Sequence, residues 1–407
     1  MRSLLIRLFF LMALCWSLGA PAALAKGTST GQSLSIHGES AILIDAATGQ
    51  VLFEKNPHAR LYPASITKIA TGIYAIENGN PDDIVTVSKK ARYEEGTRVY
   101  LAEGEQVTLR KLEYGLLMHS GNDAATAIAE HLSGTTEQFA AELTRFVREK
   151  IGVQDTNFTN AHGLHDPNHY TTAYDMAKIS QYAMKNPTFR EIVGTNRLPW
   201  DGLEWKSELV NHNKLIRNYE GATGIKNGFT DQAMHTLVGS AKRGETELIA
   251  VTMKAPSSAM AYKDVTAMLD YGFAHFETKQ VASAGETFTR PATREGETAS
   301  RFAVKEDLYA TVPIGTNPYI TVTANGQLTV VAGPLTISYP LERLNPPAEV
   351  KAAADSAATP DGQAERAYDT VTVRYALLLV WLTFNLFLIA CLVFRLRRQK
   401  RVRRREM

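Results

Sequence analysis

The sequence predicts a mixed α/β (α+β) protein in which an antiparallel sheet carries a lobe of helices, followed by a small all-β region. Two pairs of strands, one beginning near residue 40 and one near residue 236, enclose a long stretch with helical periodicity. Beyond about residue 278 the pattern changes to short β-rich runs. Because strands come from both ends of the first region, we expect them to form one sheet with the helices inserted between them.

The first residues have the pattern of a secretory signal. Arg2 and Arg7 flank the start of an apolar run that extends to Leu18, and Ala23-Leu24-Ala25 is typical of a cleavage site. We therefore assign residues 1–25 to a signal peptide. The mature chain would then begin at residue 26 and lie outside the cytoplasm.

The region 26–277 contains the predicted sheet and helices. Residues 40–45 and 51–54 are short, mainly apolar runs joined by a turn containing Gly49, and a second hairpin turns through Gly244. The second pair of strands is expected at residues 236–241 and 248–253, and helices at residues 109–118, 124–132 and 136–151. A region of roughly 250 residues is long enough to bury a substantial core.

The region 278–345 has the pattern of a small β-sandwich domain. Asn325-Gly326 is a hairpin signal between two of its apolar runs. The expected strands are residues 308–312, 319–323, 328–331 and 335–339. We expect this domain to act as a spacer between the catalytic region and the membrane.

The C-terminal part predicts a membrane anchor. Residues 346–372 are rich in Ala, Pro, Asp and Glu and indicate a flexible linker. Tyr375 to Phe394 carries no formal charge and is long enough to cross a bilayer, so we assign residues 373–396 to a transmembrane helix. Residues 397–407 form a basic tail, which the positive-inside rule places in the cytoplasm. The expected location is the cell membrane, single-pass, with the catalytic domain extracytoplasmic.

Charge and cysteine content exclude several classes of function. Residues 26–374 contain 34 basic and 41 acidic side chains, and this acidic balance argues against nucleic acid as a partner. The two cysteines, Cys15 and Cys391, lie in the predicted signal and membrane span. The exported part therefore has neither a disulfide nor a cysteine nucleophile. No Gly-rich phosphate loop, Rossmann fingerprint or G-x-S-x-G motif is present, and we expect no cofactor.

The segment Ser65-Ile66-Thr67-Lys68 is a candidate catalytic motif. Apolar residues at helical spacing follow it, so Ser65 and Lys68 are expected on one face in the first turns of a helix. A serine hydroxyl needs a base to become nucleophilic, and a lysine is such a base when its pKa is lowered by burial or by a neighbouring cation. The free N–H groups at the helix start favour a developing negative charge.

Two further segments supply polar partners for this pair. These are Ser120-Gly121-Asn122 and Lys226-Asn227-Gly228, and Lys226 could be the cation that lowers the pKa of Lys68. Each segment alone has a simpler interpretation. The first could be an ordinary turn, and Asn-Gly favours the tight turn of a β-hairpin. Serine and lysine three residues apart are also common on solvated helices.

In this order, the three motifs resemble those of penicillin-binding proteins and serine β-lactamases, which have S-x-x-K, S-x-N and K-T-G. The chain is similar in particular to the low-molecular-mass D-alanyl-D-alanine carboxypeptidases, especially the sporulation-type enzymes of Gram-positive bacteria. The resemblance runs from about Ser40 to Thr278. It includes the segments 63–68, 116–125, 160–164, 169–177 and 224–230. It implies the penicillin-recognising fold, with the site between the sheet and the helical lobe.

The resemblance also implies catalytic roles. Ser65 would form an acyl ester with the penultimate D-alanine, Lys68 would accept its proton, and Ser120 would relay a proton to the leaving D-alanine. The backbone N–H groups of Ser65 and Phe229 would form the oxyanion hole. The substrate would be the D-Ala-D-Ala end of a peptidoglycan stem peptide, with β-lactams as covalent inhibitors.

The residues expected to bind the substrate are Asn122, Lys226, Asn227, Gly228 and Phe229. Asn122 would hold the substrate's amide backbone, and Lys226 would attract its terminal carboxylate. Asn227 departs from the family pattern, which has threonine there. The amide donates a similar hydrogen bond but has a different reach, so we expect slower catalysis or a narrower substrate range.

Three alternatives remain open at this point. A serine β-lactamase shares the motifs, and a non-catalytic penicillin-binding sensor would retain the fold. The histidines at positions 162, 165 and 169 would have the residue type and number for a zinc site, although a polar loop is the simpler interpretation. Our interpretation is a membrane-anchored serine D-alanyl-D-alanine carboxypeptidase without a metal.

Overall fold

The computed structural model describes residues 34–291, 299–332 and 335–344. Among these residues, no helix is both long and apolar enough to span a membrane. Four predicted segments lie outside the described part of the chain: the signal peptide (1–25), the linker (346–372), the membrane span (373–396) and the basic tail (397–407).

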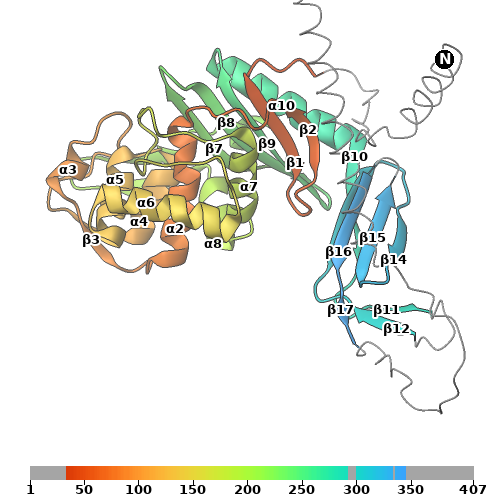
Figure 1. Cartoon of the computed structure of the whole chain (residues 1–407). Coiled ribbons are helices and arrows are strands. Elements are labelled where there is room, and N and C mark those ends of the chain that lie inside the picture. The colour runs from red at the N-terminus through yellow and green to blue at the C-terminus, as the bar shows by residue number, and fades with distance from the viewer. Residues whose placement is uncertain (1–33, 292–298, 333–334, 345–407) are drawn as a thin grey trace, which may run out of the picture. The chain divides into compact units, whose positions relative to one another are not determined.

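A five-stranded antiparallel sheet forms the centre of the structure, with the strand order β2-β1-β9-β8-β7 (Figure 1). Its strands are β1 (Ser40–Asp45), β2 (Val51–Lys55), β7 (Ala222–Thr230), β8 (Met234–Arg243) and β9 (Thr246–Ala255). The two predicted hairpins are confirmed, and the strands of the second are longer than expected. β7 lies at one edge of the sheet.

The alternation of side chains along β1 explains how the sheet joins two hydrophobic cores. All six residues of β1 are buried. Ile42 and Ile44 belong to the core of the helical lobe, whereas Ala41 and Leu43 belong to a second core with α10 (Ser258–His275). Successive side chains of a strand point to opposite faces, so β1 is covered on both.

The helical lobe lies on the face of the sheet opposite α10 (Figure 1). Its main helices are α2 (Thr67–Asn78), α4 (Leu109–Met118), α5 (Asn122–Ser133), α6 (Thr136–Phe146), α7 (Ala173–Ala183) and α8 (Pro187–Gly194). The three predicted helices are confirmed. The helix expected at 136–151 ends at Phe146 and continues as a π-helical turn, Val147–Ile151.

Threonine side chains fix the start of two of the predicted helices, α4 and α6. The Thr108 hydroxyl accepts the backbone N–H of Lys111, and the Thr135 hydroxyl accepts that of Gln138. Such N-caps satisfy N–H groups that have no partner inside the helix. They explain why α4 and α6 begin at the residues expected from the sequence.

Helix α2 runs through the middle of the lobe and carries Lys68. Ile69, Ala70 and Ile73 are fully buried, and the helix is buried on almost every side of its first two turns. Gly72 allows α4 to pack closely, because a Cβ there would lie 2.8 Å from a methyl group of Leu117. A helix buried in this way holds its side chains in fixed positions.

Short elements connect the lobe to the sheet. They are β3 (Ile84–Thr86), α3 (Lys89–Arg92), β4 (Gln106–Thr108), β5 (Arg197–Asp201), β6 (Lys206–Val210) and α9 (Leu215–Asn218).

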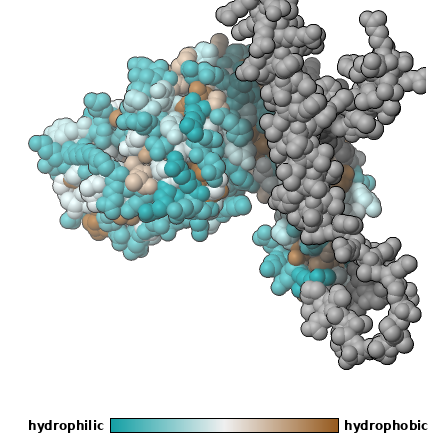
Figure 2. All heavy atoms as spheres, viewed as in Figure 1, coloured by the Kyte–Doolittle hydropathy of each residue, from teal (hydrophilic) through white to brown (hydrophobic). Residues whose placement is uncertain are grey.

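The face drawn in Figure 2 is largely hydrophilic over the described residues, with scattered hydrophobic side chains. The apolar side chains that define the larger elements are therefore mostly interior.

The C-terminal part of the described chain is built of strands. The predicted runs correspond to β13 (Leu308–Pro313), β14 (Tyr319–Val322), β15 (Gln327–Ala332) and β16 (Leu335–Pro340). Four strands were not predicted: β10 (Phe276–Ala282), β11 (Thr287–Arg290), β12 (Ser300–Ala303) and β17 (Glu342–Arg343). Leu328 and Val330 belong to a separate small core with Val312. The assignment of residues 278–345 to a β-sandwich domain stays a prediction.

Candidate active site

The structure brings the three predicted motifs together between the sheet and the helical lobe. Ser65 lies in the 3-10 turn η1 (Ala64–Ile66), which leads directly into α2. Ser65, Asn122 and Phe229 line one cavity of about 470 Å³, which we call the nucleophile cavity. These side chains come from η1, the start of α5 and the end of β7.

Lys68 is the centre of the polar contacts in this site. Its side chain is fully buried, and its Nζ lies 3.1 Å from the Ser65 Oγ. The Nζ also donates hydrogen bonds of 2.7 Å to the Asn122 Oδ1 and of 2.7 Å to the backbone carbonyl of His162. Ser65 and Lys68 therefore share one face of the helix start, as the three-residue spacing predicted.

The surroundings of Lys68 favour its uncharged form. Burial is the largest cause that lowers its pKa well below the ordinary value, and the charge of Lys226 lowers it further. The carboxylates of Asp123 and Glu94 oppose this shift. The sequence left open whether burial or a second cation would act on Lys68, and both do, with burial the stronger.

The segment 120–122 is a turn and part of the site at once. Ser120 has a φ of 67° and its side chain is buried, and Gly121 caps the start of α5. The Asn122 Nδ2 donates a hydrogen bond of 2.6 Å to the Glu95 carbonyl. Because the amide nitrogen is committed there, the amide oxygen faces Lys68, which fixes the direction of that hydrogen bond.

The hairpin-turn interpretation of residues 226–228 is wrong. These residues lie inside β7, where Lys226 pairs with Val238 and Gly228 pairs with Thr236. Gly228 is required by the close approach of the nucleophile turn. A Cβ there would lie 2.7 Å from the Ser65 backbone nitrogen and 2.6 Å from the Thr236 hydroxyl. The segment that lies beside Ser65 is therefore the extended backbone of a β-strand and not a turn.

The side chains of Lys226 and Asn227 have polar atoms that can form more hydrogen bonds than the fold provides. Lys226 is buried and its Nζ donates to the Asn227 carbonyl at 3.0 Å, while burial lowers its pKa to about 7. The Asn227 Oδ1 is buried and has no hydrogen-bond partner within the described part of the chain. Phe229 is 55 % exposed, with its ring centroid 4.6 Å from that of His235.

A family model described as D-alanyl-D-alanine carboxypeptidase matches residues 26–257. The chain belongs to this family. It is 35 % identical over 286 residues to the D-alanyl-D-alanine carboxypeptidase DacF of Bacillus subtilis. This alignment covers 68 % of this chain and 73 % of the relative. It is 32 % identical over 330 residues to DacD of Salmonella typhimurium, over 77 % of this chain and 83 % of the relative.

A solved structure supports the same assignment. Penicillin binding protein 5 from Haemophilus influenzae aligns with a TM-score of 0.70 and 27 % identity, over 77 % of this chain and 98 % of that chain. The fold is therefore the mixed α/β fold of penicillin-binding proteins. This carboxypeptidase is a serine hydrolase, and the family and its relatives favour that function over the β-lactamase and the non-catalytic sensor.

The three histidines suggested as zinc ligands have separate roles in the carboxypeptidase fold. His169 Nδ1 accepts the Thr159 backbone N–H at 3.0 Å, and its Nε2 lies 2.9 Å from the Thr67 hydroxyl. Burial lowers the pKa of His169 to about 4. The ring of His165 packs edge-on against Tyr62. Within residues 34–291, 299–332 and 335–344, no group of three or more His, Cys, Asp or Glu side chains converges as metal ligands would.

Two residues near the nucleophile, His162 and Gly163, were not assigned to the catalytic site from the sequence. The backbone carbonyl of His162 accepts from Lys68, and Gly163 has a φ of +88°. A Cβ on Gly163 would lie 1.9 Å from the Ala64 carbonyl oxygen, so this position requires glycine. The sequence could not predict the hydrogen bond from Lys68 to the His162 carbonyl, because every residue type has a backbone carbonyl that can accept.

Asp123 is a third residue whose role the sequence did not indicate. Its carboxylate accepts the backbone N–H groups of Val99 and Leu101, each at 3.1 Å, and that of Ala124 at 2.9 Å. It thereby connects the loop before β4 to the start of α5. Asp123 holds Asn122 in place without lining the nucleophile cavity itself.

The two lysines predict a bell-shaped pH dependence for acylation of the carboxypeptidase by a penicillin. Acylation should fall on the acid side as Lys68 takes up a proton, and on the alkaline side above about pH 7 as Lys226 loses its charge. In Lys226→Met the alkaline limb should disappear. The acid limb should move to higher pH, because removing a nearby cation raises the pKa of Lys68. Second-order rate constants measured by mass spectrometry check this.

The exposed Lys206 provides a matched control, and Lys206→Met should leave both limbs in place. An alkaline limb that persists unchanged in Lys226→Met would contradict the assignment of that limb to Lys226.

Proposed function

We propose that the chain removes the terminal D-alanine of peptidoglycan stem pentapeptides through an acyl ester on Ser65, and that β-lactams acylate the same oxygen. The observation that supports this most directly is the contact between the Ser65 Oγ and the buried Lys68 Nζ, at 3.1 Å. Lys68 serves as the base, and the peptide carbonyl enters through the nucleophile cavity.

The hydrogen-bond partners of Lys68 match an uncharged amine. A neutral amine has two N–H donors and one lone pair. Two oxygens that can only accept, the Asn122 Oδ1 and the His162 carbonyl, take the two hydrogens. The lone pair is then left for the Ser65 hydroxyl, which donates its proton as the oxygen attacks. The arrangement supports proton transfer from Ser65 to Lys68 without an intervening water.

The oxyanion would be held by the backbone N–H groups of Ser65 and Phe229. Gly228 supports this pairing, since its position leaves so little space beside the Ser65 nitrogen that only a hydrogen atom fits there. The start of the helix at Ser65 adds the favourable end of its dipole. Each such donor typically contributes about 3 to 4 kcal/mol to transition-state stabilisation.

The remaining polar groups would bind the substrate and complete the reaction. Ser120 relays a proton to the leaving amine, and Asn122 holds the peptide backbone. Lys226 and Asn227 hold the terminal carboxylate on the side of β7. Lys226 supplies a charge for this carboxylate, and the Asn227 Nδ2 would donate a hydrogen bond to it. As the edge of the sheet, β7 can also pair with an extended peptide.

We also propose that residues 373–396 anchor the enzyme in the cell membrane with the catalytic region outside and residues 397–407 in the cytoplasm. The uncharged stretch followed by eight basic side chains supports this topology. Alkaline phosphatase fused after residue 345 should be active, and the same reporter fused after residue 407 should be inactive. The opposite result would reject the topology.

Hydrolysis is tested with the full-length protein and a pentapeptide muropeptide. Free D-alanine should be released, and Ser65→Ala should reduce the release to background, because the acyl ester cannot form. Mass spectrometry after penicillin treatment should locate the adduct on Ser65. The exposed Ser207, which lines neither cavity, offers a matched control, and Ser207→Ala should retain the adduct.

The rejected alternatives have distinct outcomes in this assay. A penicillin adduct without D-alanine release from any stem peptide would indicate the sensor. Rapid turnover of the penicillin would indicate a β-lactamase.

Asn227→Thr tests whether the departure from the family motif limits the rate. A threonine hydroxyl is shorter than the amide and restores the family's donor to the substrate carboxylate. We expect faster acylation by both penicillin and peptide, measured as kcat/KM for the peptide and as a second-order rate constant for penicillin. Equal rates in the variant and the parent would show that Asn227 is a neutral replacement.

A further inference from the structure

A second cavity, of about 530 Å³, opens beside the end of β7, and we call it the distal cavity. Asn227, Gly228 and Phe229 line one of its sides. His119 and Phe229 line both the distal cavity and the nucleophile cavity, so the two are neighbours. The distal cavity therefore continues the active site on the side where the proposed function places the terminal carboxylate.

The distal cavity is larger than a terminal D-alanine requires. In the proposed function the penultimate carbonyl lies at Ser65 and the terminal residue lies along Asn227, so only a methyl side chain would project from it. Pockets of about 300 to 1,000 Å³ accommodate ligands of drug size. A much longer side chain on the terminal residue would therefore fit.

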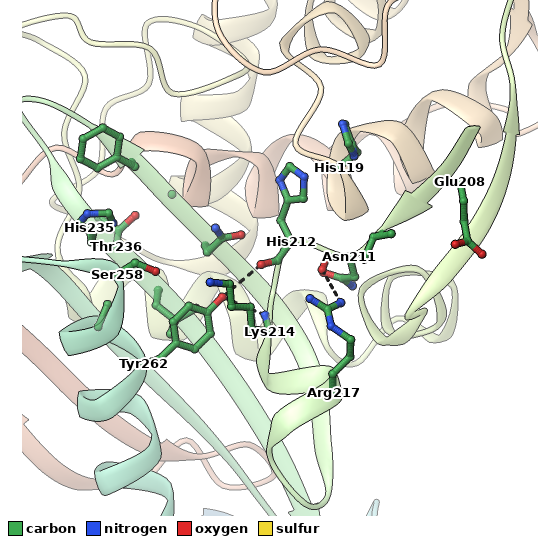
Figure 3. Close-up of a pocket in the computed structure, with 16 residues that line it drawn as sticks. His119, Glu208, Asn211, His212, Lys214, Arg217, His235, Thr236, Ser258 and Tyr262 are labelled. Carbon is green, nitrogen blue, oxygen red and sulfur yellow. Dashed lines mark hydrogen bonds between the residues drawn. The ribbon is translucent and has the colours of Figure 1, made fainter. Parts of the chain in front are cut away.

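The part of the cavity lining around α9 has an excess of positive charge. Lys214 and Arg217 lie there together, beside Tyr262 (Figure 3). Both side chains belong to exposed residues, and neither forms an ion pair with any described residue. Among the described residues that line the cavity, the one acid is Glu208, and its carboxylate already pairs with Arg197.

The imidazoles of the cavity contribute no further charge near neutral pH. Burial, followed by the charge of Lys226, lowers the pKa of both His119 and His212, the latter to about 3. Burial also lowers the pKa of His235. The positive charge available to a ligand thus comes from Lys214 and Arg217. Because the Arg217 guanidinium donates to a backbone carbonyl at 2.8 Å, Lys214 is the freer of the two cations.

We propose that the distal cavity binds the side chain of the terminal D-residue and prefers an acidic one such as D-glutamate, with Lys214 as the specificity-determining cation. This inference rests on the proposed function. In the reaction, the Ser65 oxygen forms an ester with the penultimate carbonyl carbon as its bond to the terminal nitrogen breaks. The leaving amine takes up a proton, and water then hydrolyses the ester and regenerates Ser65.

The test compares three peptides that differ only in the last residue: D-Ala-D-Ala, D-Ala-D-Gln and D-Ala-D-Glu. D-Glutamine has the shape of D-glutamate without its charge. With the full-length protein, kcat/KM for release of D-glutamate should exceed that for D-glutamine by about fivefold, the upper range for a partly exposed ion pair. The ratio should fall at high salt, which screens exposed charges.

Lys214→Met should bring this ratio close to one, and the ability of the variant to form the penicillin adduct verifies that it is folded. The exposed Lys263 of α10 does not line the cavity, and Lys263→Met should keep the ratio of the parent. A parent ratio of one, or a ratio that Lys214→Met leaves unchanged, would overturn the subsite while D-alanine release still supports the proposed function. Failure to release any terminal residue would reject both.

Discussion

The active site depends on one fully buried amine, that of Lys68, whose hydrogen-bond partners are an amide oxygen, a backbone carbonyl and the Ser65 hydroxyl. A charged ammonium in such a place loses its hydration without gaining a carboxylate contact, and this cost lowers its pKa. In the proposed mechanism the same cost creates the base. The reactivity of Ser65 is thus a consequence of where the fold buries a lysine.

The rest of the architecture keeps this amine in place. Asp123 fixes the start of α5, so that Asn122 reaches Lys68. His169 contacts Thr67, whose hydroxyl donates to the Ala64 carbonyl at 2.9 Å and so stabilises the nucleophile turn. The contact of Lys68 with Asn122 and that of Thr67 with His169 each join residues more than fifty positions apart in the sequence. A packed core, rather than local helix propensity, therefore determines the geometry of the site.

Much of the fold could be predicted because its signals are local. The apolar run at residues 40–45 and the N-caps at Thr108 and Thr135 each act within a few residues, and that strand and the starts of both helices were predicted correctly. The pattern Asn227-Gly228 shows the limit of local signals, since it favours a turn in isolation but lies inside β7. There the pairing with β8 and the closeness of Ser65 outweigh turn propensity.

The sequence predicted those parts of the candidate site that consist of side chains with a recognisable chemical role. Its motif residues are recognised by type and spacing, and the structure brings Ser65, Lys68 and Asn122 into direct contact. The carbonyl acceptor at His162 and the open cations at Lys214 and Arg217 could not be found in this way. They depend on backbone groups and surface positions that only tertiary structure places beside the site.

The most direct test of the account is a titration of Lys68 itself by NMR, with lysine labelled at Cε and Nζ and the resonance assigned through Lys68→Arg. The account predicts that Lys68 is uncharged at pH 7 and that its amine takes up a proton only in the acid range. A Lys68 resonance that titrates near the ordinary lysine pKa of about 10.4 would contradict it.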